Sequence, residues 1–229
     1  MSKIYLYGLQ RSGTNILETF IKENFNIIFN NQEIDRKSCS HKHFRFNDNK
    51  NSIPNTDVIG QYHNDVIINS IDELDIILND YNHTNKYIVV YKDIFSWLVS
   101  IRKWATMCKW ITNSNKEFLN DYLCFLGKWL SIKNDRVLFI NYNDYLNLIN
   151  DDSNDNSLLE RLNNFLKTNI SEDILNKKIN KVKCSGYFTD EKKKYYFNKE
   201  YMNEFKSEEI EFINKIISIN KLFNEFNYL

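Results

Sequence analysis

Residues 3–15, Lys-Ile-Tyr-Leu-Tyr-Gly-Leu-Gln-Arg-Ser-Gly-Thr-Asn, join an apolar run to a polar loop that is framed by two glycines. The apolar run over 3–7 predicts a short buried strand that ends at Gly8. Apolar residues then recur at helical spacing over 14–24, which predicts an amphipathic helix that starts directly after Gly13. The chain uses only five glycines, so two of them in one loop indicate a backbone that needs glycine there.

This loop has the spacing G-x-x-x-x-G between a predicted strand and a predicted helix, which is the spacing of a phosphate-binding loop. Backbone N–H groups and a helix N-terminus at such a place favour an anion. The P-loop of ATPases and GTPases continues with Lys and then Ser or Thr, whereas this chain has Thr14 and Asn15. The usual lysine is therefore absent, and Arg11 supplies a cation from inside the loop.

The rest of the chain alternates predicted strands with predicted helices. Three further strands are expected from runs rich in β-branched and aromatic residues, and helices are expected where apolar residues recur at helical spacing. The predicted strands cover 57–62, 86–91 and 136–141, and the predicted helices cover 72–79, 94 onward, 116–132, 158–166 and Ser207 onward. This order predicts an α/β fold, a three-layer sandwich with a mainly parallel sheet covered by helices on both faces, in one domain over residues 1–229.

Composition limits the function classes. The chain has 229 residues, with 30 basic and 30 acidic side chains and a formal net charge of +0. A neutral balance argues against a nucleic acid or an anionic membrane as partner. No apolar run approaches the ~20 residues of a membrane span. The four cysteines have no metal-ligand spacing and form no disulfide framework, so we expect a reducing, cytoplasmic setting and no metal site.

A second polar site is predicted at the end of the 86–91 strand. Lys92 follows this strand, and Ser100 stands eight positions later, about two turns into the next helix. Both side chains are expected above the carboxyl edge of the sheet, where ligands of open α/β sheets bind. Asp93 is a plausible N-cap for that helix. A cation at this strand end, in place of a magnesium-binding carboxylate, favours phosphate binding without a metal.

At this point the sequence resembles the sulfotransferases that use 3′-phosphoadenosine 5′-phosphosulfate. Residues 10–15, from Gln10 onward, resemble their 5′-phosphosulfate loop, and residues 91–100 resemble their 3′-phosphate motif. The strand and the residues after it over 137–145 resemble a family segment whose tyrosine, here Tyr142, helps to enclose the adenosine. The likeness covers about residues 4–25, 87–104 and 136–166.

The resemblance implies a P-loop NTPase-like fold, and it implies roles for these residues. Arg11 would hold the bridging and sulfuryl oxygens of the donor, and Lys92 with Ser100 would anchor its 3′-phosphate. The 5′-phosphate would be held by Ser12, Gly13, Thr14 and Asn15. The chain departs from the family at Lys92, where Arg is usual, and at Ile94, where Pro is usual. The C-terminal motif of the family is not recognisable, and Lys183–Gly186 or the lysines that follow are candidates to replace it.

A general base is useful because the acceptor hydroxyl loses a proton as it attacks. The chain has four histidines, and the family's base often follows a lysine between the two phosphate motifs. Lys42 and His43 match that setting, so His43 is the predicted base and Lys42 is predicted to assist the leaving group or the sulfuryl oxygens. His41 is the second candidate for the base.

The expected reaction moves a sulfuryl group from the donor to a hydroxyl of a small-molecule, carbohydrate or peptide acceptor and leaves adenosine 3′,5′-bisphosphate. A P-loop kinase acting on a nucleoside or another small molecule is one alternative. A non-catalytic relative that kept the nucleotide fold is the other. Magnesium-dependent formation of ADP from ATP would favour the kinase, and donor turnover would argue against the non-catalytic relative. Composition gives no oligomeric state.

Overall fold

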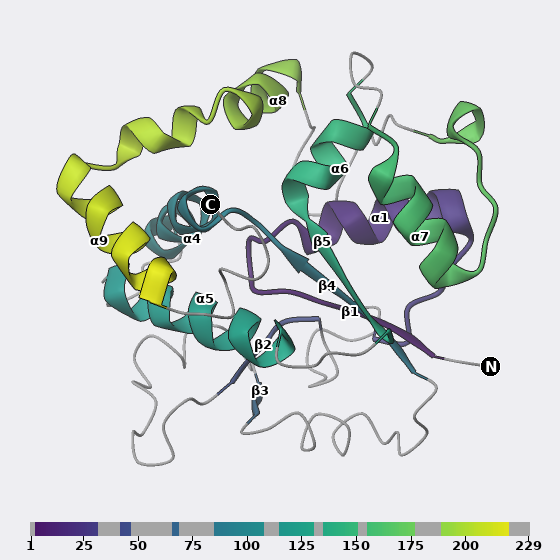
Figure 1. Ribbon diagram of the computed structural model, residues 1–229, viewed down its shortest axis with the longest axis horizontal. Coiled ribbons are helices and arrows are strands. Elements are labelled where there is room, and N and C mark those ends of the chain that lie inside the picture. Colours follow the sequence, from purple (N-terminus) through teal and green to yellow (C-terminus); the bar gives the residue numbers. More distant parts are fainter. Residues whose placement is uncertain are drawn as a thin grey trace.

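A three-stranded parallel sheet lies at the centre of the described structure. The computed structural model describes residues 3–31, 42–46, 66–68, 85–107, 115–130, 135–150, 155–176 and 189–219. The strands are β1 (Ile4–Tyr7), β4 (Lys86–Tyr91) and β5 (Val137–Asn141), and they pair in the order β1-β4-β5 (Figure 1). Their carboxyl ends therefore point to one edge, with the end of β4 in the middle.

The strands are apolar on both faces because both faces are covered by helices. Tyr7 and Val89 belong to one buried cluster, whereas Leu6 and Ile88, their neighbours along the strands, belong to another. Successive side chains of a strand point to opposite faces, so a strand buried on both sides reads as an unbroken apolar run. Such a run is what the sequence shows at β4.

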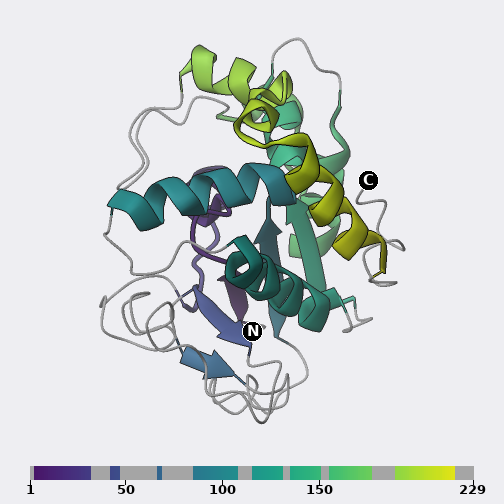
Figure 2. The same cartoon turned by 90° about the vertical axis from the view of Figure 1, so that its left-hand side faces the viewer.

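Helices form a layer on each face of the sheet. One layer holds α4 (Ile94–Met107), α5 (Asn115–Leu130), the short 3₁₀ helix η2 (Glu200–Glu204) and α9 (Ser207–Ile219). The other holds α1 (Thr14–Phe25), α6 (Tyr142–Leu148) and α7 (Ser157–Leu166). Both views show the two groups of helices on opposite sides of the sheet (Figures 1 and 2). The fold is therefore α/β, with a central parallel sheet between two layers of helices.

The remaining described elements lie outside these layers. A two-stranded parallel sheet of β2 (Phe44–Phe46) and β3 (Val66–Ile68) lies beside α5, and η1 (Glu172–Ile174) follows α7. Helix α8 (Asp190–Phe197) runs on the side of the sheet edge that carries the strand ends (Figure 1). Within the described segments, no helix combines the length and the apolar character that a bilayer crossing needs.

Most predicted elements are confirmed. The strands around residues 3–7, 86–91 and 136–141 and the predicted helices that begin near 14, 94, 116, 158 and 207 all occur at those places. Helices α6 and α8 and strands β2 and β3 were not predicted. The strand predicted over 57–62 and the helix predicted over 72–79 lie outside the described residues, and the single domain over 1–229 stays a prediction.

The N-cap predicted for α4 is confirmed. Oδ1 of Asp93 accepts hydrogen bonds from the backbone N–H groups of Phe95 and Ser96, at 3.0 Å each. These bonds satisfy two of the N–H groups that a helix start leaves without a partner.

We expect Asp93→Ala to lower the free energy of unfolding by about 1 kcal/mol, because it removes this cap. Asp93→Asn is the matched control, since its amide oxygen still accepts at the same place and most of the stability is retained. Urea unfolding measures both variants. Equal losses in the two variants would contradict the cap as the source of the effect.

Candidate functional site

The loop between β1 and α1 is a tight turn held by one carbonyl oxygen. Leu9 O accepts from the backbone N–H of Ser12 at 3.1 Å and from its hydroxyl at 2.7 Å. Arg11 has a φ of 69° and Gly13 a φ of 96°, so the chain turns through left-handed backbone at both. Both hydrogen-bond donors of Ser12 are thus directed to Leu9 O within the loop. The contact of Ser12 with a 5′-phosphate stays a prediction.

Glycine is required at both ends of the loop because neighbouring atoms leave no room for a Cβ atom. A Cβ atom at Gly13 would lie 2.5 Å from the ring of Tyr142, and a Cβ atom at Gly8 would lie 2.6 Å from Val90 O. Real Cβ atoms do not approach other atoms so closely. The loop therefore rests directly on the end of β4 and on the first residue of α6.

Helix α1 starts at the end of this loop. Thr14 is buried at its first position, and Asn15 follows as a half-buried residue. The described contacts include no partner for the backbone N–H groups of Gly13 and Thr14. Helix starts leave such donors to be satisfied by an anion, by water or by a cap. The backbone here is compatible with the predicted phosphate contacts.

The loop also contacts α4. Trp97 Nε1 donates to Gln10 O at 2.8 Å, and the guanidinium carbon of Arg11 lies 4.9 Å from the centre of the Trp104 ring. The side-chain oxygen of Gln10 is buried without a hydrogen-bond partner among the described residues. The Arg11 side chain itself is exposed. The Arg11 charge therefore lies on the exposed side of the loop, over the Trp104 ring of α4, the helix that also carries Ser100.

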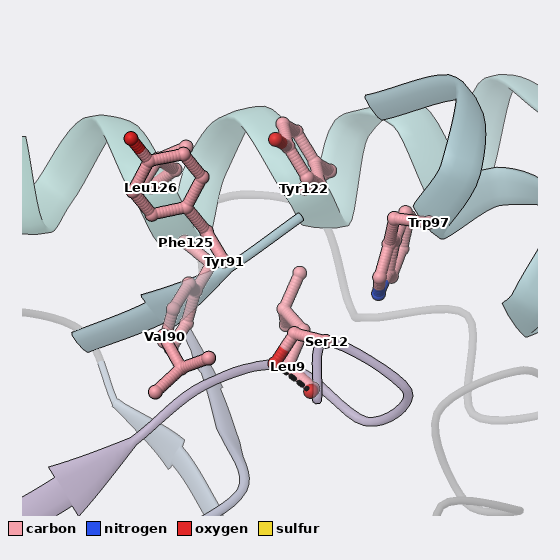
Figure 3. A pocket seen from close by; sticks show the side chains of 8 residues that line it. All are labelled: Leu9, Ser12, Val90, Tyr91, Trp97, Tyr122, Phe125 and Leu126. Atoms are coloured by element: carbon pink, nitrogen blue, oxygen red, sulfur yellow. Dashed lines mark hydrogen bonds between the residues drawn. The ribbon is translucent and has the colours of Figure 1, made fainter. Parts of the chain in front are cut away.

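A small apolar pocket lies behind the loop, and it is lined by Leu9, Ser12, Val90, Tyr91, Trp97, Tyr122, Phe125 and Leu126 (Figure 3). Its volume is about 10 Å³ for a water-sized sphere. A single water needs about that much space, so the pocket has no room for a substrate. The Arg11 side chain, in contrast, is exposed on the loop.

Lys92 is a buried cation at the end of the central strand. Only 5% of the residue is exposed, and its ammonium donates to the Tyr196 hydroxyl at 3.1 Å. The ammonium also lies 4.5 Å from the ring centre of Tyr142 and 4.7 Å from that of Tyr196. No carboxylate contacts it within the described residues. Burial lowers the pKa of Lys92, so the folded chain holds this charge at a cost.

Ser100 converges on the same atom as Lys92. Burial alone would raise the pKa of Tyr196, but the charge and hydrogen bond of Lys92 and a hydrogen bond with Ser100 lower it below its ordinary value. The predicted convergence of an ammonium and a hydroxyl eight residues apart is thus present. The oxygen that they share in this structure belongs to Tyr196.

Tyr142 connects the two motifs. It is buried at the start of α6, which begins where β5 ends and is capped by the side chain of Asn141, an acceptor for Asn143 N–H at 2.9 Å. One ring thus lies against Gly13 of the loop and close to the Lys92 ammonium. The loop and the second motif therefore meet in one place.

Electrostatic coupling also links the two motifs. Burial has the largest influence on the pKa of Lys92, Tyr142 and Tyr196, and the positive charge of Arg11 is near enough to act on all three in the lowering direction. For Tyr142 burial dominates, and its pKa lies well above the usual range, so its phenol stays neutral. Arg11 of the loop and Lys92 of the second motif therefore both lower the pKa of Tyr196.

Lys42 and His43 are attached to the start of the loop. Gly8 N–H donates to Lys42 O at 3.0 Å, and His43 Nδ1 lies 2.7 Å from Gly8 O. A carbonyl oxygen can only accept, so Nδ1 carries a proton and the lone pair of the neutral ring is on Nε2. The Lys42 ammonium lies 2.5 Å from a carboxylate oxygen of Glu18. Burial alone would raise the pKa of Glu18, but Lys42 and Lys22 lower it below its ordinary value.

This arrangement gives His43 the tautomer that a general base needs and keeps it beside the loop. It directs the ammonium of Lys42 to α1, where Glu18 lies, so the assisting role predicted for Lys42 stays a prediction. The second candidate base, His41, lies outside the described residues.

Tyr196 is the site residue that the sequence did not identify. It belongs to α8, a helix that was not predicted. Oγ1 of Thr189 caps α8 by accepting from Lys192 N–H at 3.3 Å, and Asp190 and Glu191 follow in the first turn. A Thr-Asp-Glu start is a recognisable helix signal that could have located this helix. Lys183–Gly186 lies outside the described residues.

The described residues contain no group of three or more His, Cys, Asp or Glu side chains that could hold a metal ion. The expectation of a metal-free site stays a prediction. Comparison of the chain with protein-family models, with curated proteins and with solved structures finds no match.

Proposed function

We propose that this chain is a sulfotransferase with a P-loop NTPase-like fold, which moves a sulfuryl group from 3′-phosphoadenosine 5′-phosphosulfate to an acceptor hydroxyl. The observation that carries the proposal is the position of Tyr142, whose ring lies against Gly13 and 4.5 Å from the Lys92 ammonium. A glycine-framed loop and a cation–hydroxyl pair thus face one volume at the carboxyl edge of the sheet. That edge is where α/β proteins bind nucleotides.

The charges favour an anionic ligand with two separated phosphates. Lys92 is buried with no carboxylate partner among the described residues, so a phosphate that reached it would offset the cost of its burial. Arg11 presents a second cation at the loop, with the first turn of α1 beside it. An arginine suits the planar recognition of a phosphate or sulfuryl group.

In the proposed reaction the acceptor oxygen attacks sulfur while the bond from sulfur to the bridging phosphate oxygen breaks. The electron pair of that bond stays on the phosphate, where Arg11 stabilises the developing charge. Nε2 of His43 takes the proton of the acceptor hydroxyl. Catalysis is then mainly positioning and preorganised positive charge, and Lys92 with Ser100 anchors the far end of the donor.

The kinase alternative lacks its metal ligand. A carboxylate directly after the second strand would hold magnesium in a P-loop kinase. Here Lys92 takes that position, and Oδ1 of Asp93 is bonded to two N–H groups of α4. Burial also raises the pKa of Asp93, which disfavours its charged form. These contacts favour the sulfuryl donor over ATP with magnesium.

The first test compares adenosine 3′,5′-bisphosphate with AMP in thermal unfolding. A ligand at about 100 times its dissociation constant stabilises the folded state by about 2.7 kcal/mol. We expect the bisphosphate to raise the melting temperature and AMP to do much less, because AMP has no 3′-phosphate for Lys92. Equal shifts from the two nucleotides would contradict the 3′-phosphate site.

A further inference from the structure

The Tyr196 hydroxyl lies at the position where Lys92 and Ser100 would bind a phosphate. It accepts from the Lys92 ammonium at 3.1 Å, and Ser100 is near enough to lower the pKa of the same hydroxyl. Its ring packs against both buried clusters, one on each face of the sheet. The end of α8 thus closes the carboxyl edge at the end of β4.

A phenol oxygen resembles a phosphate oxygen in the contacts that it makes here. It is an acceptor for an ammonium and a hydrogen-bond partner for a serine hydroxyl. Positive charge from Lys92 and Arg11 lowers the pKa of this phenol, although burial acts in the opposite direction. A phosphate would carry a full negative charge, so it would form an ion pair with Lys92, where the neutral phenol is only a polar acceptor.

Helix α8 has the character of an element that can move. It has eight residues, none of which is buried, and most of its side chains are charged or aromatic. Segments with few buried contacts open at low free-energy cost. The contacts described for its C-terminal part centre on the aromatic rings of Tyr195 and Tyr196, which pack against Tyr142 and Tyr201.

We propose that Tyr196 is an internal occupant of this anion position, and that a ligand phosphate displaces it and moves α8 away from the sheet edge. The inference rests on the proposed function only in naming a nucleotide as the source of the phosphate. Its core is a competition between one phenol and one phosphate for Lys92 and Ser100. Ligand binding and the position of α8 are then linked, because both depend on the same two donors.

The test measures the affinity of inorganic phosphate for the wild-type protein, for Tyr196→Phe and for the control Tyr195→Phe. The Tyr195 hydroxyl lies 3.2 Å from Glu204 on the exposed side of α8, so its loss removes a phenol from the same helix without touching Lys92. We expect Tyr196→Phe to bind phosphate about tenfold more tightly, because one hydrogen bond to a charged group no longer competes. We expect Tyr195→Phe to bind as the wild type does. Circular dichroism confirms that each variant is folded.

Hydrogen exchange gives a second readout in the wild-type protein. If phosphate displaces Tyr196, the amides of residues 190–197 exchange faster when phosphate is added. Weaker or unchanged phosphate binding by Tyr196→Phe, or slower exchange in α8, would overturn the inference. The same titrations with adenosine 3′,5′-bisphosphate separate it from the proposed function. If Tyr196→Phe gains affinity for phosphate while the bisphosphate binds no better than phosphate, the displacement stands and the nucleotide assignment fails.

Discussion

If the proposed function holds, we expect Arg11→Ala to lower donor turnover by about 10²–10³-fold and to leave the fold intact. This is the effect of removing one preorganised charge or donor aimed at the developing negative charge of a transition state. The side chain is exposed and lies over the ring of Trp104, so its loss creates no buried cavity. Alanine and arginine accept the left-handed backbone at this position at similar cost, so the turn is preserved. Turnover is measured as release of adenosine 3′,5′-bisphosphate with a library of acceptor hydroxyls.

Arg102→Ala is the matched control for Arg11→Ala. Its guanidinium also lies on an aromatic ring, that of Phe205 at 4.4 Å, and 3.8 Å from a Glu209 oxygen, but it belongs to α4 and not to the loop. We expect turnover near the wild-type level in that variant. If Arg11→Ala also kept near-wild-type turnover, Arg11 would not be the cation that stabilises the transition state.

Lys92→Met separates ligand binding from stability. We expect the affinity for adenosine 3′,5′-bisphosphate to fall about 10²-fold, because the 3′-phosphate loses a charge-assisted hydrogen bond worth several kcal/mol in a buried site. The ligand-free variant should melt at the same temperature as the wild type or higher. Burial lowers the pKa of Lys92, so below that pKa the folded state carries a charge that the unfolded chain holds more easily. Methionine fills a similar volume without that cost.

Lys86→Met is the control for Lys92→Met, since Lys86 is on the same strand at the opposite end and near the Phe165 ring. Calorimetric titration and thermal unfolding are compared for both variants. We expect Lys86→Met to bind the bisphosphate as the wild type does. An equal loss of affinity in the two variants would mean that a change anywhere in β4 weakens binding, and it would contradict a specific contact between Lys92 and the 3′-phosphate.

The framework of the site was predictable because it depends on short-range spacing. An apolar run followed by a glycine fixes where β1 ends, and the interval between Lys92 and Ser100 puts both side chains above the sheet edge. The cap at Asp93 is equally local. In these cases the residues that decide the structure are within about two helical turns of each other.

The parts that were missed depend on contacts between distant segments. Tyr196 reaches Lys92 from a helix with no buried residue, so no apolar periodicity marks its inward side. The ion pair of Lys42 with Glu18 joins the segment around β2 to α1, and nothing in the spacing of the two residues indicates it. One missed feature is local: the Ser12 hydroxyl donates to Leu9 O within the turn, and the glycine spacing of the motif does not specify this bond.

The contact between Gly13 and Tyr142 has a consequence for sequence change at the site. Because a Cβ atom at Gly13 would meet the ring at 2.5 Å, the two positions form one coupled unit and do not vary independently. A mutational library that varies the loop alone will return glycine at position 13. A library that also varies Tyr142 removes the close approach, but the φ of 96° at Gly13 still favours glycine there.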